Sequence, residues 1–133
     1  LGRAVVPLLL DTGPFAMLLL ESKFMRAGVR KKIEESDVVL VSAIAFYEIA
    51  QKAWIGKWAE MEPFVEGLED FAARSGIDMV DLSAGLALDA ALLDWPHRDP
   101  FDRIIAATAL RERVPLVSSD RAFDALGIER VWE

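Results

Sequence analysis

Short apolar runs alternate along the chain with longer stretches in which apolar residues are spaced as in a helix. The runs are rich in β-branched residues and leucine, as strands are, and they occur at 5–10, 38–41, 78–82, 115–118 and 128–132. The longer stretches predict helices at 14–35 in two pieces, 43–57, 63–74, 84–93 and 100–113. Because crossover helices join strands that run in the same direction, this alternation predicts an α/β fold with a mostly parallel sheet covered on both faces.

The length of 133 residues suits one domain that spans residues 1–133. With 53% hydrophobic residues the chain can fill a sizeable core, but no apolar run is long enough to cross a bilayer, so we expect no membrane partner. The first residues lack a secretory pattern and there is no cysteine, which favours a cytoplasmic location. The net charge of −7 opposes general binding to nucleic acid, so nucleic-acid chemistry must be local or bridged by a metal ion.

Acidic residues occur where the predicted strands end. Asp11 and Asp120 closely follow the first and fourth strands, and Glu48 is the acid of an otherwise apolar and aromatic helix after the second. Asp99 and Asp102 open the helix before the fourth strand, and their spacing of three places them on one helical face. The carboxyl ends of parallel strands share one edge of the sheet, where ligands of such folds bind. We therefore predict a group of carboxylates at this edge.

Carboxylates that lie this close together repel one another unless a cation holds them. Mg²⁺ is the natural candidate, with Mn²⁺ as a substitute, because these ions take oxygen ligands. A zinc site of thiolates and imidazoles is excluded, since the chain has no cysteine and a single histidine, His97. No serine or cysteine stands in a nucleophile motif beside His97, which argues against nucleophilic catalysis and favours an ordinary loop histidine.

Each acid, taken alone, also has a purely structural explanation. These explanations are a turn for Asp11, a helix N-cap for Asp99 and Asp120, an ion pair with Lys52 for Glu48, and the dipole of a helix for Asp102. None of them explains why all the acids should meet at one edge of the sheet. That coincidence carries the functional hypothesis.

Four segments in series resemble the successive motifs of PIN domains, particularly the VapC-type ribonuclease toxins of toxin–antitoxin pairs. They are LLLDTGPF, VSAIAFYEIAQKAWIGKW, HRDPFDRIIAATAL and PLVSSDRAFDALGIERVW, which together cover nearly the whole chain. The resemblance implies a three-layer α/β/α sandwich with a five-stranded, mainly parallel sheet. It also implies a Mg²⁺-dependent endoribonuclease that acts on RNA, a cognate antitoxin protein as partner, and a homodimer.

Carried over by position, the family's acidic quartet falls on Asp11, Glu48, Asp102 and Asp120, with Asp99 as an additional acid. In this interpretation Asp11 and Asp102 hold Mg²⁺, while Glu48 and Asp120 complete its shell or position a second ion. The metal then activates water for hydrolysis of an RNA phosphodiester.

Three arginines flank these acids and are either contacts for RNA phosphates or ordinary surface charge: Arg98, Arg103 and Arg121. The chain departs from the family pattern at Ala45, where serine is frequent, and at Ser118, where threonine is common, but neither change removes a carboxylate. A non-catalytic PIN-fold module that binds RNA or protein is the alternative. A receiver-type signalling domain fits less well, because it needs paired acids after the first strand and a late lysine, whereas no lysine follows Lys57.

Overall fold

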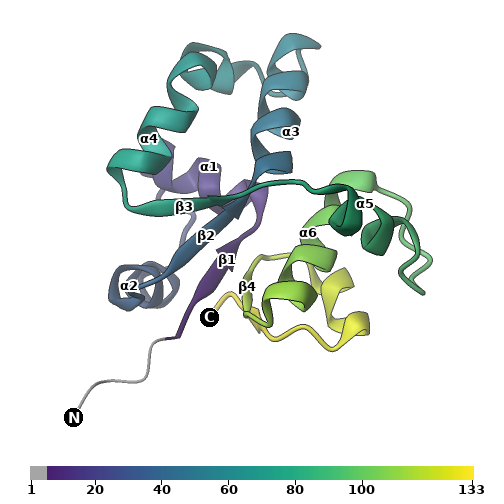
Figure 1. Ribbon diagram of the computed structural model, residues 1–133. Helices are drawn as coiled ribbons and strands as arrows, with labels where there is room; N and C mark the ends of the chain where they lie inside the picture. Colours follow the sequence, from purple (N-terminus) through teal and green to yellow (C-terminus); the bar gives the residue numbers. More distant parts are fainter. Residues whose placement is uncertain (1–5) are drawn as a thin grey trace.

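The computed structural model describes residues 6–133 and has the predicted alternation of strands and helices (Figure 1). Val5, with which the first predicted strand begins, lies outside the described residues. In chain order the elements are β1 (Leu8–Leu10), α1 (Thr12–Leu20), α2 (Ala27–Glu35), β2 (Val39–Ser42), α3 (Ala43–Trp54), η1 (Ala59–Gly67), α4 (Leu68–Arg74), β3 (Ile77–Val80), α5 (Ala84–Ala91), α6 (Pro100–Glu112), β4 (Leu116–Val117), η2 (Arg121–Leu126) and β5 (Arg130–Val131).

The five strands form one sheet in the order β3-β2-β1-β4-β5, and all neighbouring pairs are parallel. Leu10 at the end of β1 is in register with Val41 of β2 on one side and with Val117 of β4 on the other. The predicted five-stranded parallel sheet is therefore confirmed. The order of strands reverses at β1, since β2 and β3 are added on one side of it and β4 and β5 on the other. Parallel sheets bind ligands beyond the carboxyl ends of the strands at such a reversal, here between β1 and β4.

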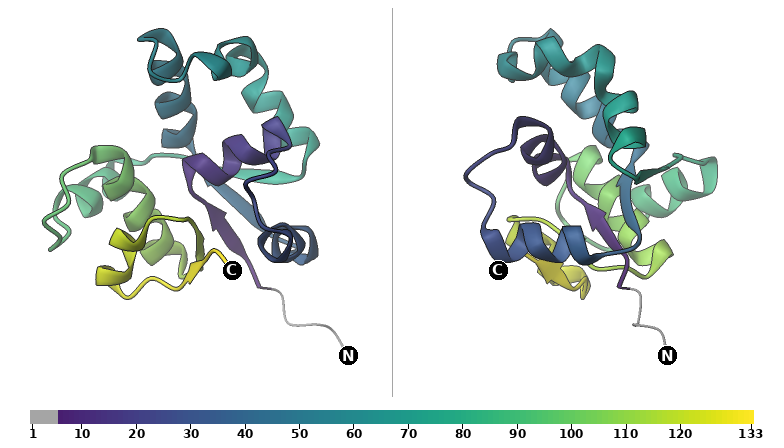
Figure 2. Two further views of the ribbon diagram at one scale, coloured as in Figure 1. Left: turned by 180° about the vertical axis from the view of Figure 1, so that it is seen from behind. Right: turned by 90° about the vertical axis from the view of Figure 1, so that its left-hand side faces the viewer.

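Alternate residues of a strand face opposite layers of the molecule, as the two-residue period of a strand requires. Leu8 and Leu10 pack in a core with residues of α1, α2, α3, η1 and α4, whereas Leu9 packs in a second core with residues of α6 and η2. Figure 2 shows α1 and α2 on one side of β1, and α6 with the C-terminal segment on the other. A smaller cluster joins α5 to the outer side of α6. The predicted three-layer α/β/α sandwich is confirmed.

The structure differs from the predicted helix at residues 63–74. A 3₁₀ helix, η1, extends from Ala59 to Gly67, and only α4 is α-helical. Pro63 lies inside η1, where its missing N–H disfavours a regular α-helix, and Gly67 further weakens helical propensity. Within residues 6–133, none of the helices combines the length and apolar character needed to cross a membrane.

Candidate active site

Asp11 lies where β1 ends and α1 begins. One of its carboxylate oxygens accepts a hydrogen bond of 2.8 Å from the backbone N–H of Thr12, so that Asp11 is the N-cap of α1. The other oxygen accepts a hydrogen bond of 2.7 Å from the hydroxyl of Ser118, which directly follows β4. Asp11 therefore joins the two strands that flank the reversal of strand order. One side chain thus both caps α1 and lies at the edge of the sheet where β1 and β4 end.

Asp120 lies just beyond β4 and is the N-cap of η2, as predicted. One of its carboxylate oxygens accepts a hydrogen bond of 2.9 Å from the backbone N–H of Ala122. The backbone N–H of Asp120 donates to the Ser118 hydroxyl oxygen at 3.0 Å, while the same hydroxyl donates to Asp11. Ser118 is fully buried and so fixes the position of one acid relative to the other.

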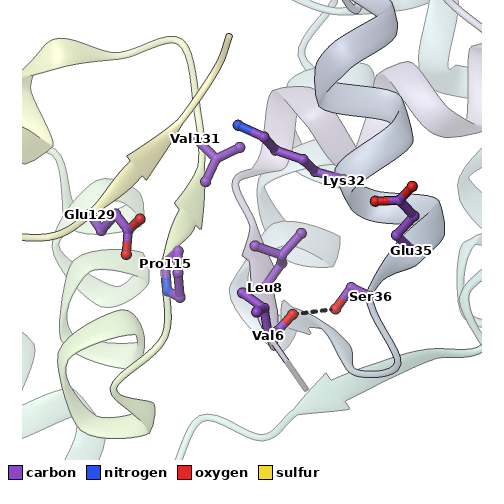
Figure 3. A pocket seen from close by; sticks show the side chains of 8 residues that line it. All are labelled: Val6, Leu8, Lys32, Glu35, Ser36, Pro115, Glu129 and Val131. Carbon is purple, nitrogen blue, oxygen red and sulfur yellow. Dashed lines mark hydrogen bonds between the residues drawn. The ribbon is translucent and has the colours of Figure 1, made fainter. Parts of the chain in front are cut away.

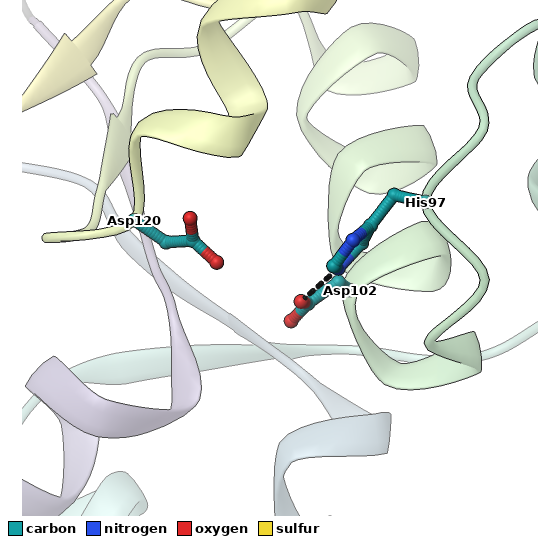
Figure 4. Close-up of side chains that lie close together, drawn as sticks. All are labelled: His97, Asp102 and Asp120. Atoms are coloured by element: carbon teal, nitrogen blue, oxygen red, sulfur yellow. Dashed lines mark hydrogen bonds and ion pairs between the residues drawn. The ribbon is translucent and has the colours of Figure 1, made fainter.

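Two acids in the first turn of α6 have different orientations. Asp99 is the predicted N-cap, because its carboxylate accepts a hydrogen bond of 2.8 Å from the backbone N–H of Phe101. Asp102 faces the site, and its Oδ2 lies 2.6 Å from Nε2 of His97. Figure 4 shows the carboxylate of Asp120 directed toward Asp102, with the His97 ring over Asp102. Potential ligand atoms of His97, Asp102 and Asp120 all lie within 4.8 Å of one another.

Glu48, on α3, is almost completely buried and lies outside the group of His97, Asp102 and Asp120, although its charge acts on both Asp11 and Asp102. Its carboxylate accepts a hydrogen bond from Lys52 one turn later, which confirms the predicted ion pair. Burial lowers the pKa of Lys52, but the hydrogen bond with Glu48 and the charges of Glu48, Asp99 and Asp102 outweigh this effect and raise it. Lys52 is thus a positively charged side chain close to Glu48, Asp99 and Asp102.

Burial and mutual repulsion make the ionised form of two site acids costly. Burial raises the pKa of Asp11 to about 6 against the opposing hydrogen bonds from Ser118 and Thr12, and the charges of Asp102 and Glu48 raise it further. The pKa of Asp102 is also raised, first by burial and then by the charges of Asp99 and Glu48, although its contact with His97 lowers it. A divalent cation bound beside these carboxylates would offset this cost.

The donor set fits a divalent ion such as Mg²⁺ or Mn²⁺. Its oxygens come from carboxylates, the ligands that these ions prefer, and one imidazole lies beside them. The buried hydroxyl of Thr12, next to Asp11, has no hydrogen-bond partner in the part of the chain that the structure describes. A water held in the site would satisfy it.

Replacing Asp11 with Asn is expected to change how stability depends on pH when a chelator removes divalent ions. The pKa of Asp11 is about 6 in the folded protein and 3.8 in its ordinary state, so the unfolded chain ionises first as the pH rises. The folded state therefore loses stability between these values and recovers none of it above pH 6. For this pKa difference the loss amounts to roughly 3 kcal/mol. Asn does not ionise and avoids the loss.

Urea unfolding in chelator, at about pH 4.5 and about pH 7.5, measures this effect. Relative to the parent chain, Asp11→Asn should gain about 2 kcal/mol between the two pH values, because about 1 kcal/mol of the parent's loss has already occurred at pH 4.5. A weakened hydrogen bond with Ser118 acts at both pH values and cancels from this difference. Asp124→Asn is the control, because the hydrogen bond with Arg130 lowers the pKa of Asp124, so its contribution to stability is already nearly complete at pH 4.5 and the variant should show almost no change relative to the parent between the two pH values. If the free energy of unfolding of Asp11→Asn exceeds that of the parent by the same amount at both pH values, the pKa of Asp11 is not raised in the folded protein.

The three arginines predicted to contact RNA lie in different surroundings. Arg98 and Arg121 are exposed, so contact with RNA phosphates stays a prediction for both, beside ordinary surface charge. Arg103 instead donates all five of its N–H bonds, at 2.7 to 3.1 Å, to the backbone carbonyls of Ala90, Ala91, Leu93, Trp95 and His97. No N–H of Arg103 remains for a phosphate, so the geometry favours a structural role for this arginine.

His97 is the site residue that the sequence analysis set aside. It lies two residues before the N-cap of α6, and the chain folds back there so that its ring contacts the third residue of the helix, Asp102. His97 is the second residue before the N-cap and Asp102 the third residue of the helix, one position short of the pair that a hydrophobic staple joins. No local capping motif in the sequence therefore signals this contact.

A pocket at the opposite end of the sheet lies away from these acids (Figure 3). It is lined by residues that precede or begin strands, among them Leu8 of β1, Pro115 before β4 and Glu129 before β5. Its polar side chains include Lys32, Glu35 and Ser36, and none of the predicted site acids lines it. The predicted site acids Asp11 and Asp120 follow the carboxyl ends of β1 and β4 instead.

Comparison with solved structures gives the same fold. The toxin VapC20 of Mycobacterium tuberculosis, described as cleaving the sarcin–ricin loop, superposes with a TM-score of 0.69 at 16% identity and covers 95% of this chain and 99% of its own. FitAB bound to an IR36 DNA fragment gives 0.69 at 20% identity, over 95% and 96% of the two chains. VapBC2 of Rickettsia felis bound to a promoter DNA fragment gives 0.69 at 17% identity, over 96% and 100%.

Comparison with sequences adds a family and one curated relative. The relative is the ribosomal RNA small subunit methyltransferase B of Xylella fastidiosa, which is 31% identical over 109 residues and 71% of this chain. The chain spans only about a quarter of that protein (26%). The family model of the PIN domain matches residues 8–129, from the first residue of β1 to the residue before β5. The sheet has the parallel order β3-β2-β1-β4-β5, and acids follow the strands at its reversal point. Because the family model covers nearly the whole chain, the chain belongs to the PIN domain family.

Proposed function

We propose that this protein is a divalent-metal-dependent endoribonuclease and the toxin of a toxin–antitoxin pair. Two observations at the reversal point of a PIN-domain sheet support the proposal: candidate ligand atoms of Asp102 and Asp120 lie within 4.8 Å of each other, and the charges of Asp102 and Glu48 act on Asp11. The raised pKa values of Asp11 and Asp102 support it, because they indicate carboxylates that a cation would stabilise. Mg²⁺ is the proposed ion, with Mn²⁺ as an alternative.

The residues of the chain divide the work of such a reaction. Asp11 and Asp102 are the proposed principal ligands, and Ser118 and His97 hold them by hydrogen bonds. Glu48 and Asp120 complete the acidic wall, while Lys52 partly neutralises it. A bound divalent ion lowers the pKa of a water nucleophile and offsets charge that develops on the phosphate. The exposed arginines Arg98 and Arg121 are the proposed contacts for the RNA backbone.

Incubation of purified protein with RNA tests the proposal. We expect RNA fragments in Mg²⁺ or Mn²⁺ and intact RNA when a chelator is added before the metal. Intact RNA under all conditions, together with a shift of RNA mobility in a native gel, would support the alternative function of a PIN-fold module that binds RNA without cleaving it. If the RNA stays intact and its mobility does not shift, the remaining candidate function is a PIN-fold module that binds protein.

The antitoxin partner is proposed because a toxin–antitoxin complex from Klebsiella pneumoniae has the same fold, with a TM-score of 0.54 at 18% identity. Aromatic residues on α3 give such a partner an apolar surface, since Trp54 is 88% exposed and Tyr47 is 57% exposed. A groove lined by Ala53, Trp54 and Val65 runs between α3 and η1. Co-expression with the protein encoded next to it should give a complex that no longer cleaves RNA, and Trp54→Ser should weaken that complex.

A homodimer is the proposed assembly. Leu88 and Leu92, on and just after α5, are 63% and 80% exposed and form an apolar surface separate from α3. Light scattering of the purified chain measures the mass directly. Leu92→Ser is expected to shift the protein toward the monomer, while a parent chain that is already monomeric at high concentration would refute the dimer.

Asp99→Asn is expected to lower RNA cleavage by less than about tenfold, which is about 1.4 kcal/mol of activation free energy. Asn caps helices as well as Asp does, so this variant keeps the hydrogen bond to Phe101 and removes only the charge. Asp99→Ala removes the cap as well and should lower the free energy of unfolding by about 1 kcal/mol. A loss of activity in Asp99→Asn as large as that in Asp102→Asn would make Asp99 a ligand and not only a cap.

A further inference from the structure

His97 lies at the mouth of the acidic group and is held there. Its side chain is 33% exposed, whereas that of Asp102 is 19% exposed, so a solvated ion can reach the imidazole. The ring packs against Trp95 with centroids 4.7 Å apart, and Trp95 itself packs against the buried Phe123 at 5.6 Å. Arg103 donates to the backbone carbonyl of His97 at 2.9 Å and to that of Trp95 at 2.7 Å. Packing of its ring on Trp95 and hydrogen bonds from Arg103 to the loop backbone therefore hold His97 in place.

The position of the imidazole matches that of a ligand. Atoms bound to one ion at about 2.1 Å lie roughly 3 Å apart when adjacent and roughly 4.2 Å apart when opposite. Nε2 of His97 is 2.6 Å from Oδ2 of Asp102, and the candidate ligand atoms of His97, Asp102 and Asp120 lie within 4.8 Å of one another. Small shifts bring all three atoms onto one ion.

We infer that His97 is a direct nitrogen ligand of the metal ion and makes this a mixed nitrogen and oxygen site that prefers Mn²⁺ to Mg²⁺. Imidazole nitrogen suits transition ions, while Mg²⁺ favours an all-oxygen shell. Asp102 and Asp120 supply the oxygens beside the imidazole. The fold brings these three side chains together from separate parts of the chain (Figure 4). The inference rests on the proposed function in that it assumes a divalent ion among the site acids.

The chain offers an unambiguous spectroscopic test, because His97 is its only histidine. Mn²⁺ is added to the full chain and the bound ion is examined by pulsed electron paramagnetic resonance for coupling to a histidine ¹⁴N nucleus. We expect this coupling in the parent chain and its absence in His97→Asn and His97→Gln. The affinity for Mn²⁺ should fall about tenfold in both variants, while the affinity for Mg²⁺ changes by less than about threefold.

The Gln variant separates a ligand from a positioning residue, since its side-chain N–H can still donate to Asp102. If the parent chain binds Mn²⁺ without nitrogen coupling and His97→Gln keeps the parent affinity, His97 only orients Asp102 and the inference is wrong. The proposed nuclease function survives that result. If the parent chain binds neither Mn²⁺ nor Mg²⁺, both the inference and the proposed metal site are wrong.

Discussion

Asp102→Asn and Asp11→Asn are each expected to lower metal-dependent RNA cleavage by at least about 100-fold, which corresponds to roughly 3 kcal/mol of lost transition-state stabilisation. Asn has nearly the same shape as Asp but carries no charge. It can still accept a hydrogen bond from His97 or Thr12, so the local geometry is kept. The substitution removes a proposed anionic metal ligand from a buried place, where electrostatic interactions are stronger than they are in water.

Unfolding does not account for the expected loss, because the raised pKa values predict that both variants are at least as stable as the parent in chelator near neutral pH. Initial rates on a labelled RNA, with far-ultraviolet circular dichroism on the same samples, make the measurement. Asp89→Asn, the same change at an exposed position of α5, is the matched control and should retain parental activity. Cleavage within tenfold of the parent by either site variant would remove that acid from the proposed ligand set.

Much of the fold followed from local rules. Alternating strand and helix segments predicted a parallel sheet, and the helix starts at Asp99-Pro100 and at Asp120 were predicted from N-cap chemistry, which is decided within a few residues. The segment 63–74 was predicted less well, because apolar spacing alone does not distinguish an α-helix from the 3₁₀ helix that forms around Pro63. Strand order was not predicted, since it depends on pairings between distant segments.

The acids of the site were predictable for the same local reason. A residue that ends a strand of a parallel sheet and caps the next helix is carried to the shared edge by the strand itself, as happens with Asp11 and Asp120. For these residues the capping explanation and the site explanation are complementary, since a carboxylate has two oxygens and the cap uses one. The sequence did not reveal Ser118 as the link between the two acids, because that contact joins residues 107 positions apart.

His97 was missed because its position depends on tertiary contacts. The loop that carries it follows Ala91 and precedes Asp99, has no strand or helix period, and is shaped by hydrogen bonds from one side chain in α6. Arg103 is adjacent in sequence to Asp102 and was therefore considered as a contact for RNA. In the structure the two neighbours point to different partners, Asp102 to His97 and Arg103 to the loop carbonyls. The helix thus positions both a site acid and the loop that covers it.

Arg103→Lys is expected to lower the free energy of unfolding by roughly 3 kcal/mol, a large effect for a change that keeps the charge. Lysine has three N–H donors on a single nitrogen atom. It cannot reach five carbonyls that are spread over residues 90–97. Carbonyls that lose their partner inside the structure incur a desolvation cost unless the loop opens to water. We therefore expect the loop between α5 and α6 to loosen and the contact between His97 and Asp102 to weaken.

Urea unfolding and amide hydrogen exchange test this together. Exchange should quicken in the loop that contains Trp95 and His97 and stay unchanged in α1, which Arg103 does not contact. Arg111→Lys is the matched control on the same helix, because Arg111 makes one long hydrogen bond of 3.4 Å, to Ser83, and should cost no more than about 0.5 kcal/mol. If the two variants lose equal stability, the carbonyl contacts of Arg103 contribute little. His97 would then be held mainly by Trp95, and α6 would not organise both the acid and the loop of the site.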